Sequence, residues 1–169
     1  MTGRENSKEG LSVSKTMLMP QEEMLEVKSK GEKMKIGIPC DFSKVEYRVP
    51  LTPQAVDLLT SYGHEIYVEK NAGNQASYSD DDYRQAGAVI VDKKEEVFQC
   101  DLILRVAPFS SDEIDLLRGN QAVISNMQIQ AHCKESIQKL MEKRITTIAF
   151  ENIENEDGFM PVVHQMSQI

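Results

Sequence analysis

Paired cysteines, clustered basic residues and long apolar runs are all missing from this sequence. The three cysteines, Cys40, Cys100 and Cys133, lie far apart and form no CxxC pair, which argues against zinc-binding and thioredoxin-type motifs. Reduced thiols of a cytoplasmic protein are the simplest interpretation of such isolated cysteines. No apolar run approaches the roughly 18–20 residues that a membrane span needs, so we predict no transmembrane segment.

Positive charge is also scarce. The chain has 19 lysines and arginines against 27 aspartates and glutamates, a formal net charge of −8. Nucleic-acid and anionic-membrane partners need clustered basic side chains, so the composition argues against both. Residues 1–33 form a polar arm without the apolar core of a secretory signal, and we expect a cytoplasmic location. Within this arm, Pro20–Lys28 predicts a short helix.

The short motifs of common active sites are absent as well. None of the nine glycines forms a G-x-G pair, so the turn that cradles a dinucleotide pyrophosphate is missing, and no P-loop is present. His64, His132 and His164 have no neighbouring nucleophile motif, and we interpret them as turn or surface residues. Asp80–Asp82 would splay around a helix, so we predict a solvated helix start and no metal site.

Short, β-branched apolar runs recur along the chain from Met34 onward. Most are continuous and do not alternate with polar residues, which is typical of strands covered on both faces by helices. The predicted strands are Lys35–Pro39, Glu65–Glu69, Ala88–Val91, Asp101–Val106, Gln121–Ser125 and Thr146–Phe150.

Helical patterns lie between these runs. Their predicted starts share a capping hydroxyl, and they are Thr52 before Pro53, Ser79 with Asp82 and Ser110 with Glu113. The first of these helices is expected to end at Gly63, and Cys133–Arg144 predicts an amphipathic helix. The alternation of strands and helices predicts an α/β fold with a doubly wound, mostly parallel sheet.

Pro161–Ile169 looks like the first turns of an apolar helix, so we expect the native polypeptide to continue.

One segment, Tyr47–Pro53 (YRVPLTP), carries a candidate binding residue after the first predicted strand. Ligands of a doubly wound sheet bind beyond the carboxyl ends of its strands, which is where Arg48 is expected. A guanidinium there can hold a carboxylate through two parallel hydrogen bonds that lysine cannot copy. Taken alone, such a loop arginine is more often an ordinary surface charge.

The surroundings of Arg48 resemble the N-terminal domain shared by alanine dehydrogenase and the proton-translocating nicotinamide nucleotide transhydrogenase. The runs KIGIP, RVPLTP, YGHEIYVE and NAG carry this likeness, which continues through YRQAGA, DLILRVAP, IAFE and PVVHQMSQ. Enzymes that form or split saccharopine share a weaker version. The resemblance implies a Rossmann-like or flavodoxin-like substrate domain over residues 34–169, which lacks the dinucleotide fingerprint and faces an NAD-binding domain across a cleft.

The resemblance also implies a function. The complete protein would be an NAD-dependent amino-acid oxidoreductase of the alanine dehydrogenase kind, a homo-oligomer that binds a small amino acid or keto acid. NAD would be held mainly by a following domain, so residues 1–169 alone would be inactive. Arg48 matches the arginine that grips the substrate carboxylate, and Met166 and Ser167 match a Met-Ser pair that approaches the nicotinamide. We expect Ser167 to open a helix there.

Two positions depart from the alanine dehydrogenases. Where they read KVKEP, this chain reads Arg105-Val106-Ala107-Pro108. Ala107 stands at the position of their substrate-contacting lysine and cannot supply a cation. Arg105, at the position of the first lysine, keeps a positive charge for substrate binding. Where they carry a catalytic histidine, the alignment gives Gln128, which can hydrogen-bond a substrate but cannot act as an acid or base. Transhydrogenase domains lack both groups too. Two alternatives therefore stay open, an NAD(H)-binding transhydrogenase component and a non-catalytic domain for ligand sensing or oligomer assembly.

Overall fold

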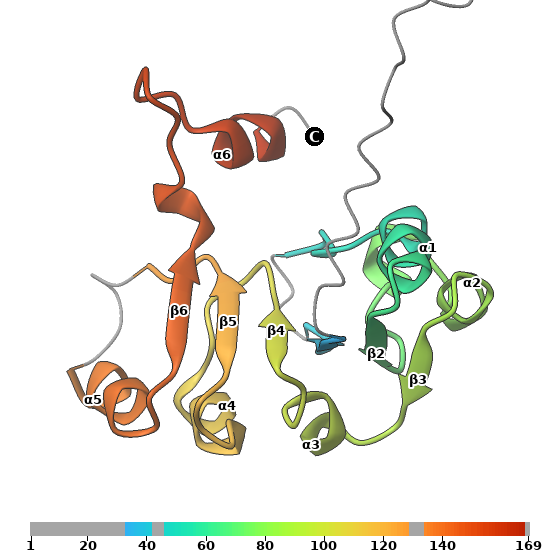
Figure 1. The fold of residues 1–169 in the computed structure, drawn as a ribbon, viewed down its shortest axis with the longest axis horizontal. Coiled ribbons are helices and arrows are strands. Elements are labelled where there is room, and N and C mark those ends of the chain that lie inside the picture. Colours follow the sequence, from blue (N-terminus) through green and yellow to red (C-terminus); the bar gives the residue numbers. More distant parts are fainter. Residues whose placement is uncertain (1–32, 42–45, 129–133, 168–169) are drawn as a thin grey trace, which may run out of the picture. The chain divides into compact units, whose positions relative to one another are not determined.

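A six-stranded sheet organises the chain in this computed structural model, which describes residues 33–41, 46–128 and 134–167. Every neighbouring pair of strands is parallel, and the order is β3-β2-β1-β4-β5-β6 (Figure 1). The strands are β1 (Lys35–Ile38), β2 (Glu65–Glu69), β3 (Val89–Val91), β4 (Leu102–Leu104), β5 (Ala122–Ser125) and β6 (Thr146–Ala149). This is the order of a doubly wound sheet. The predicted α/β fold is confirmed, and each of the six predicted strands is present.

Helices α1 to α5 connect successive strands, and α6 follows the last one. They are α1 (Pro53–Ser61), α2 (Asp80–Gln85), α3 (Lys94–Val97), α4 (Ser111–Leu116), α5 (Lys134–Glu142) and α6 (Pro161–Met166), with the 3₁₀ turns η2 (Asn74–Ala76) and η3 (Phe150–Asn152). Helix α1 begins as predicted, because the Thr52 hydroxyl caps it and Pro53 follows. It stops before Gly63, whose φ of 92° favours glycine. Both predicted capping boxes are formed, at Ser79 and at Ser110.

Two apolar clusters cover the two faces of the sheet. On one face, Val56 of α1 and Tyr83 of α2 pack with Ile38 and Val68 of the central strands. The other cluster joins α3, α4 and α5 to β4 and β5, and its fully buried members include Val97, Phe98, Ile103, Ile114 and Val123. Helices therefore lie on both faces, as the continuous apolar strands predict.

Helix α3 was not predicted from the sequence, and a glycine accounts for its position. A Cβ on Gly37 would lie 2.6 Å from the carbonyl oxygen of Val97, so α3 rests directly on the backbone of β1. The helix is short and its start has no side-chain cap, which is why it leaves little local signal.

Some predictions fall outside the described residues. These are the polar arm with its helix at Pro20–Lys28, together with His132 and Cys133. The described part of the predicted amphipathic helix is α5, and the predicted helix at the end of the chain is present as α6, which lies beyond the carboxyl end of β6 (Figure 1).

Candidate functional site

Two pockets lie at the carboxyl ends of β4, β5 and β6. The larger has a volume of about 470 Å³ and is mostly apolar. Its lining comes from the segment before α1, from the ends of the three strands and from α6: Arg48, Val49, Pro50, Leu51, Leu104, Arg105, Val106, Ile124, Phe150, Ile153, Val162 and Met166. This is the edge of the sheet where doubly wound folds bind their ligands.

The smaller pocket, of about 170 Å³, is more polar. It is lined by Arg48, Asn126, Phe150, Glu151, Val163, Met166 and Ser167. Arg48, Phe150 and Met166 line both pockets, so the two cavities meet at these three side chains. The sequence-predicted residues Arg48, Met166 and Ser167 are thus brought together, although 118 positions separate Arg48 from Met166.

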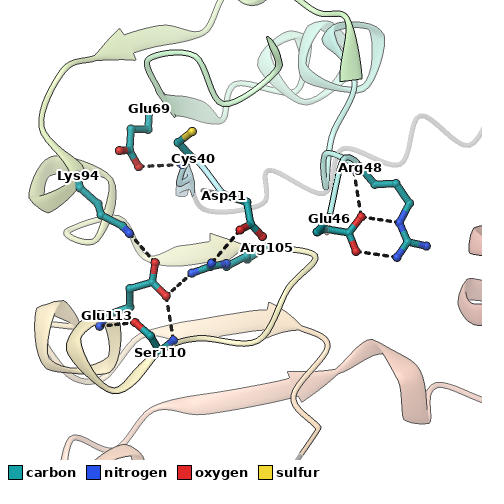
Figure 2. A network of polar contacts seen from close by, with 9 residues as sticks. All are labelled: Cys40, Asp41, Glu46, Arg48, Glu69, Lys94, Arg105, Ser110 and Glu113. Atoms are coloured by element: carbon teal, nitrogen blue, oxygen red, sulfur yellow. Dashed lines mark hydrogen bonds and ion pairs between the residues drawn. The ribbon is translucent and has the colours of Figure 1, made fainter. Parts of the chain in front are cut away.

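Arg48 is held from two sides. Its Nε and Nη2 each donate a 2.7 Å hydrogen bond to the carboxylate of Glu46, and its Nη1 donates to the carbonyl oxygen of Met166 at 3.2 Å (Figure 2 shows the pairing with Glu46). The hydrogen bond between the two side chains raises the pKa of Arg48 and lowers the pKa of Glu46. These contacts within the protein orient the arginine, and its side chain keeps 39% of its surface exposed.

The segment that follows Arg48 is fixed at its far end. Thr52 caps α1 by accepting a hydrogen bond from the Ala55 amide at 3.4 Å. The preceding carbonyl, that of Leu51, accepts a 2.8 Å hydrogen bond from the hydroxyl of Tyr83. Tyr83 is buried, and this burial raises its pKa to about 12. The path of the chain into α1 is therefore set by a cap and by one buried phenol.

Arg105 belongs to an internal ion network. Its guanidinium donates to Asp41 at 3.2 Å and also to Glu113, whose other carboxylate oxygen accepts from Lys94. Figure 2 shows Glu113 between the two cations, with the amide of Ser110 donating to it at 2.9 Å. Arg105 lines the larger pocket, but its two terminal nitrogens are engaged inside the protein. Its predicted role in substrate binding stays a prediction.

Burial and charge oppose each other at Glu113. Burial raises the pKa of this carboxyl, but the hydrogen bonds from Lys94 and Ser110, together with the charge of Arg105, outweigh burial and leave the pKa below its ordinary value. The predicted capping box at Ser110 thus has a second function that its spacing does not reveal. The same carboxylate anchors Arg105, the residue after β4, and Lys94 of α3 to the start of α4.

A second buried acid sits close to the network. The carboxylate of Glu69 accepts a 2.8 Å hydrogen bond from the amide of Cys40 (Figure 2). Burial raises the pKa of Glu69, and burial with the nearby carboxylates raises the pKa of the Cys40 thiol to about 11. A buried thiol that resists ionisation is unsuited to nucleophilic chemistry.

Gln128 lies after the end of β5 in a left-handed conformation, with φ of 40°. Its backbone amide donates a 2.9 Å hydrogen bond to Oε1 of Glu151. The residue is exposed, and it is not among the described residues that line either pocket. Its assignment to the catalytic position stays a prediction.

Ser167 ends a helix, although we expected from the sequence that it would open one. It is the C-cap of α6, and its hydroxyl donates a 2.8 Å hydrogen bond to the carbonyl oxygen of Val163. The expectation was wrong because α6 starts at Pro161. Met166 and Ser167 nevertheless both line the smaller pocket.

Three polar residues at the site were not singled out from the sequence: Glu46, Asn126 and Glu151. Glu151 stands in the run IAFE, which contributed to the family resemblance but received no role. Its buried Oε2 and the buried Oδ1 of Asn126 have no hydrogen-bond partner within the described ranges. No sequence signal identifies an unsatisfied oxygen, because its partners are set by tertiary packing.

The other residues considered from the sequence are not among those that line these pockets. His64 occupies the turn between α1 and β2, and His164 lies in α6 against the ring of Phe159. Among the described residues, no group of three histidine, cysteine or acidic side chains is arranged to hold a metal ion. No helix in the described part of the chain is both long and apolar enough to cross a membrane.

Comparison with known proteins identifies the family. Residues 37–169 match the family model described as "Alanine dehydrogenase/PNT, N-terminal domain". The alanine dehydrogenase of Staphylococcus epidermidis is 32% identical over 136 residues, which are 80% of this chain and 36% of that protein. The alanine dehydrogenase of Mycolicibacterium smegmatis is 32% identical over 137 residues, 80% of this chain and 37% of the relative.

Solved structures agree with this match. An L-alanine dehydrogenase superposes with a TM-score of 0.75 at 31% identity, covering 79% of this chain and 37% of the other. A transhydrogenase from Sinorhizobium meliloti superposes with a TM-score of 0.66 at 28% identity, covering 72% and 36%. This chain thus spans little more than a third of the length of the proteins it matches. It belongs to the family of alanine dehydrogenase and transhydrogenase N-terminal domains.

Proposed function

We propose that residues 34–169 form the substrate-side domain of a cytoplasmic, homo-oligomeric, NAD-dependent amino-acid dehydrogenase. The proposed reaction converts L-alanine, NAD⁺ and water to pyruvate, ammonium, NADH and a proton. Support comes from the alanine dehydrogenases among the relatives and from the position of Arg48 where the two pockets meet. The position of Arg48 is the observation that carries the proposal.

Arg48 keeps donors for a substrate carboxylate. A guanidinium has five N–H groups, and the contacts to Glu46 and Met166 use Nε, Nη2 and Nη1 once each. Among the described residues, one hydrogen thus remains on each terminal nitrogen, enough for a two-pronged grip on a carboxylate. Glu46 would hold the guanidinium plane while the substrate binds, so the arginine acts by positioning more than by chemistry.

The residues at the rim of the smaller pocket fit a nicotinamide. Met166 offers an apolar side chain that lines both pockets, and the Ser167 hydroxyl, which donates to Val163, still has lone pairs to accept a hydrogen bond from a carboxamide. These two residues would hold the nicotinamide end of NAD, and the rest of the cofactor would be bound mainly by sequence outside this domain. When bound, NAD⁺ accepts the hydride that leaves the substrate Cα.

The experiment is an assay of the complete protein with L-alanine and NAD⁺, and in reverse with pyruvate, ammonium and NADH. We expect alanine-dependent NADH formation that is lost in Arg48→Ala. Binding of L-alanine without NADH formation would instead support a non-catalytic ligand-sensing or assembly domain.

A second candidate is an NAD(H)-binding component of a transhydrogenase. The superposition on the Sinorhizobium meliloti protein favours it, as do Ala107 and Gln128 at positions where alanine dehydrogenases carry a lysine and a histidine. Hydride transfer between two nicotinamide nucleotides without any response to amino acids would identify this function.

A further inference from the structure

Two residues that line the smaller pocket each carry a buried acceptor oxygen that has no donor within the described ranges. Asn126 and Glu151 both line this pocket, and Oδ1 of the first and Oε2 of the second are buried without a hydrogen-bond partner. Burying an unsatisfied acceptor destabilises the folded state, and more so when the group is charged. Such atoms are rare in folded proteins and call for an explanation.

The sheet brings these two residues together. Strands β5 and β6 pair in parallel as far as Ser125 and Ala149. Asn126 is the next residue after β5, and Glu151 lies in the 3₁₀ turn that follows β6 directly. The carboxylate is also held in place, because its Oε1 accepts the 2.9 Å hydrogen bond from the Gln128 amide. Its second oxygen is therefore kept in position for another donor.

The pocket combines opposite charges. Arg48 contributes a guanidinium, and Glu151 contributes a carboxylate whose second oxygen is unsatisfied. The natural complement of two clustered acceptors, one of them charged, is an ammonium group, which has three donors and no acceptor. A ligand with both an ammonium and a carboxylate would complement both charged side chains of this pocket.

We propose that Glu151 and Asn126 form an ammonium-binding subsite in the pocket that Arg48 also lines, and that this subsite selects small zwitterionic 2-amino acids over carboxylates without an amino group. This inference rests on the proposed function, because it takes the smaller pocket as the substrate site. Bound water could also satisfy the two oxygens. Water would not make ligand affinity depend on the charge of Glu151, and the experiment uses this difference.

The test compares L-alanine with propionate, which has the same carbon chain and carboxylate but no ammonium. Binding of each is measured by calorimetry on the complete protein and on Glu151→Gln. Glutamine keeps an oxygen that can accept from the Gln128 amide, so the local backbone is preserved while the charge is lost. We expect Glu151→Gln to weaken L-alanine binding about tenfold to a hundredfold, the range for a hydrogen bond to a charged group. Propionate binding should stay within about twofold, well below the effect of one charged hydrogen bond.

Two further variants complete the design. Asn126→Leu removes the second acceptor at similar volume and should also weaken L-alanine selectively. Glu154→Gln is the matched control, because Glu154 is exposed, close in sequence and outside both pocket linings. It should change neither affinity.

The outcomes separate the two proposals. If the native protein binds both ligands and neither Glu151→Gln nor Asn126→Leu changes their ratio of affinities, the ammonium subsite is wrong and the proposed function stands. If the native protein binds neither ligand, the proposed function fails and the subsite with it. Selective loss of L-alanine binding in both variants supports the subsite.

Discussion

The phenol of Tyr83 in α2 donates its hydrogen to the carbonyl oxygen of Leu51, across the 2.8 Å that separates the two oxygens. Leu51 lies in the same segment as Arg48, so a buried side chain of one helix fixes the chain that presents the candidate carboxylate-binding residue. The hydrogen bond thus connects the stability of the domain to the geometry of the pockets.

Removing this hydroxyl tests the connection. Tyr83→Phe leaves the Leu51 carbonyl without its donor and should lower the free energy of unfolding by about 1–2 kcal/mol. Urea denaturation measures this loss. Tyr62→Phe is the control, because Tyr62 is 73% exposed and its change should have no measurable effect. Equal stabilities of the native protein and Tyr83→Phe would show that the hydrogen bond contributes nothing.

Arg48 provides the most direct functional test. Arg48→Ala should cost about 1.5–3 kcal/mol of substrate binding, the range for hydrogen bonds to a charged group. Arg48→Lys should recover only part of this, because an ammonium cannot reproduce the two-pronged geometry. Steady-state kinetics with L-alanine measures both, and Arg84→Ala serves as the control, because the Arg84 side chain is exposed on α2. Unchanged kcat and KM in Arg48→Ala would rule out the assignment.

The buried network around Glu113 should make stability depend on acid pH. The pKa of Glu113 lies below its ordinary value of 4.5 in the folded state, so its contribution is present above that value. This contribution is lost as the pH falls through the lowered folded-state pKa. At neutral pH, Glu113→Gln should cost about 3–5 kcal/mol, because it leaves Arg105 and Lys94 without their shared anion.

Chemical denaturation from pH 7 down to pH 3 tests this directly. The difference between the native protein and Glu113→Gln should shrink towards acid pH. A difference that stays constant over this range would show that ionisation of Glu113 is not what stabilises the fold.

The buried thiols should be poorly reactive. Burial is the main cause that raises the pKa values of both Cys40 and Cys100 to about 11, from 9.0. At pH 8 the thiolate fraction, which is the reactive form, should be about a hundredfold lower than in the unfolded chain. Iodoacetamide labelling followed by peptide mass spectrometry measures each cysteine separately. Labelling as fast as in urea would contradict the burial of these side chains.

Local signals account for most of what the sequence predicted correctly. The capping boxes at Ser79 and Ser110 depend on residues three positions apart, and continuous apolar runs mark the buried parallel strands. The four-residue helix α3 has no such signal, because its position depends on the missing side chain of Gly37.

The candidate site was only partly predictable for the same reason. Arg48 could be placed at the ligand edge because it follows the first strand, and the resemblance added Met166 and Ser167. The pairing of Arg48 with Glu46, the engagement of Arg105 by Asp41 and Glu113, and the unsatisfied oxygen of Glu151 all depend on side-chain packing. A linear pattern carries no information about which partner a buried charge finds.

The parallel sheet has a consequence for the kinetics of folding. Its central strand β1 pairs with β2 and with β4, and Lys35 in β1 contacts Asp101, 66 positions away. Parallel neighbours cannot be joined by a tight turn, so no hairpin can nucleate this sheet. Long loops must close before the central strands can pair, and we expect refolding to be slower than in a helical bundle of similar size.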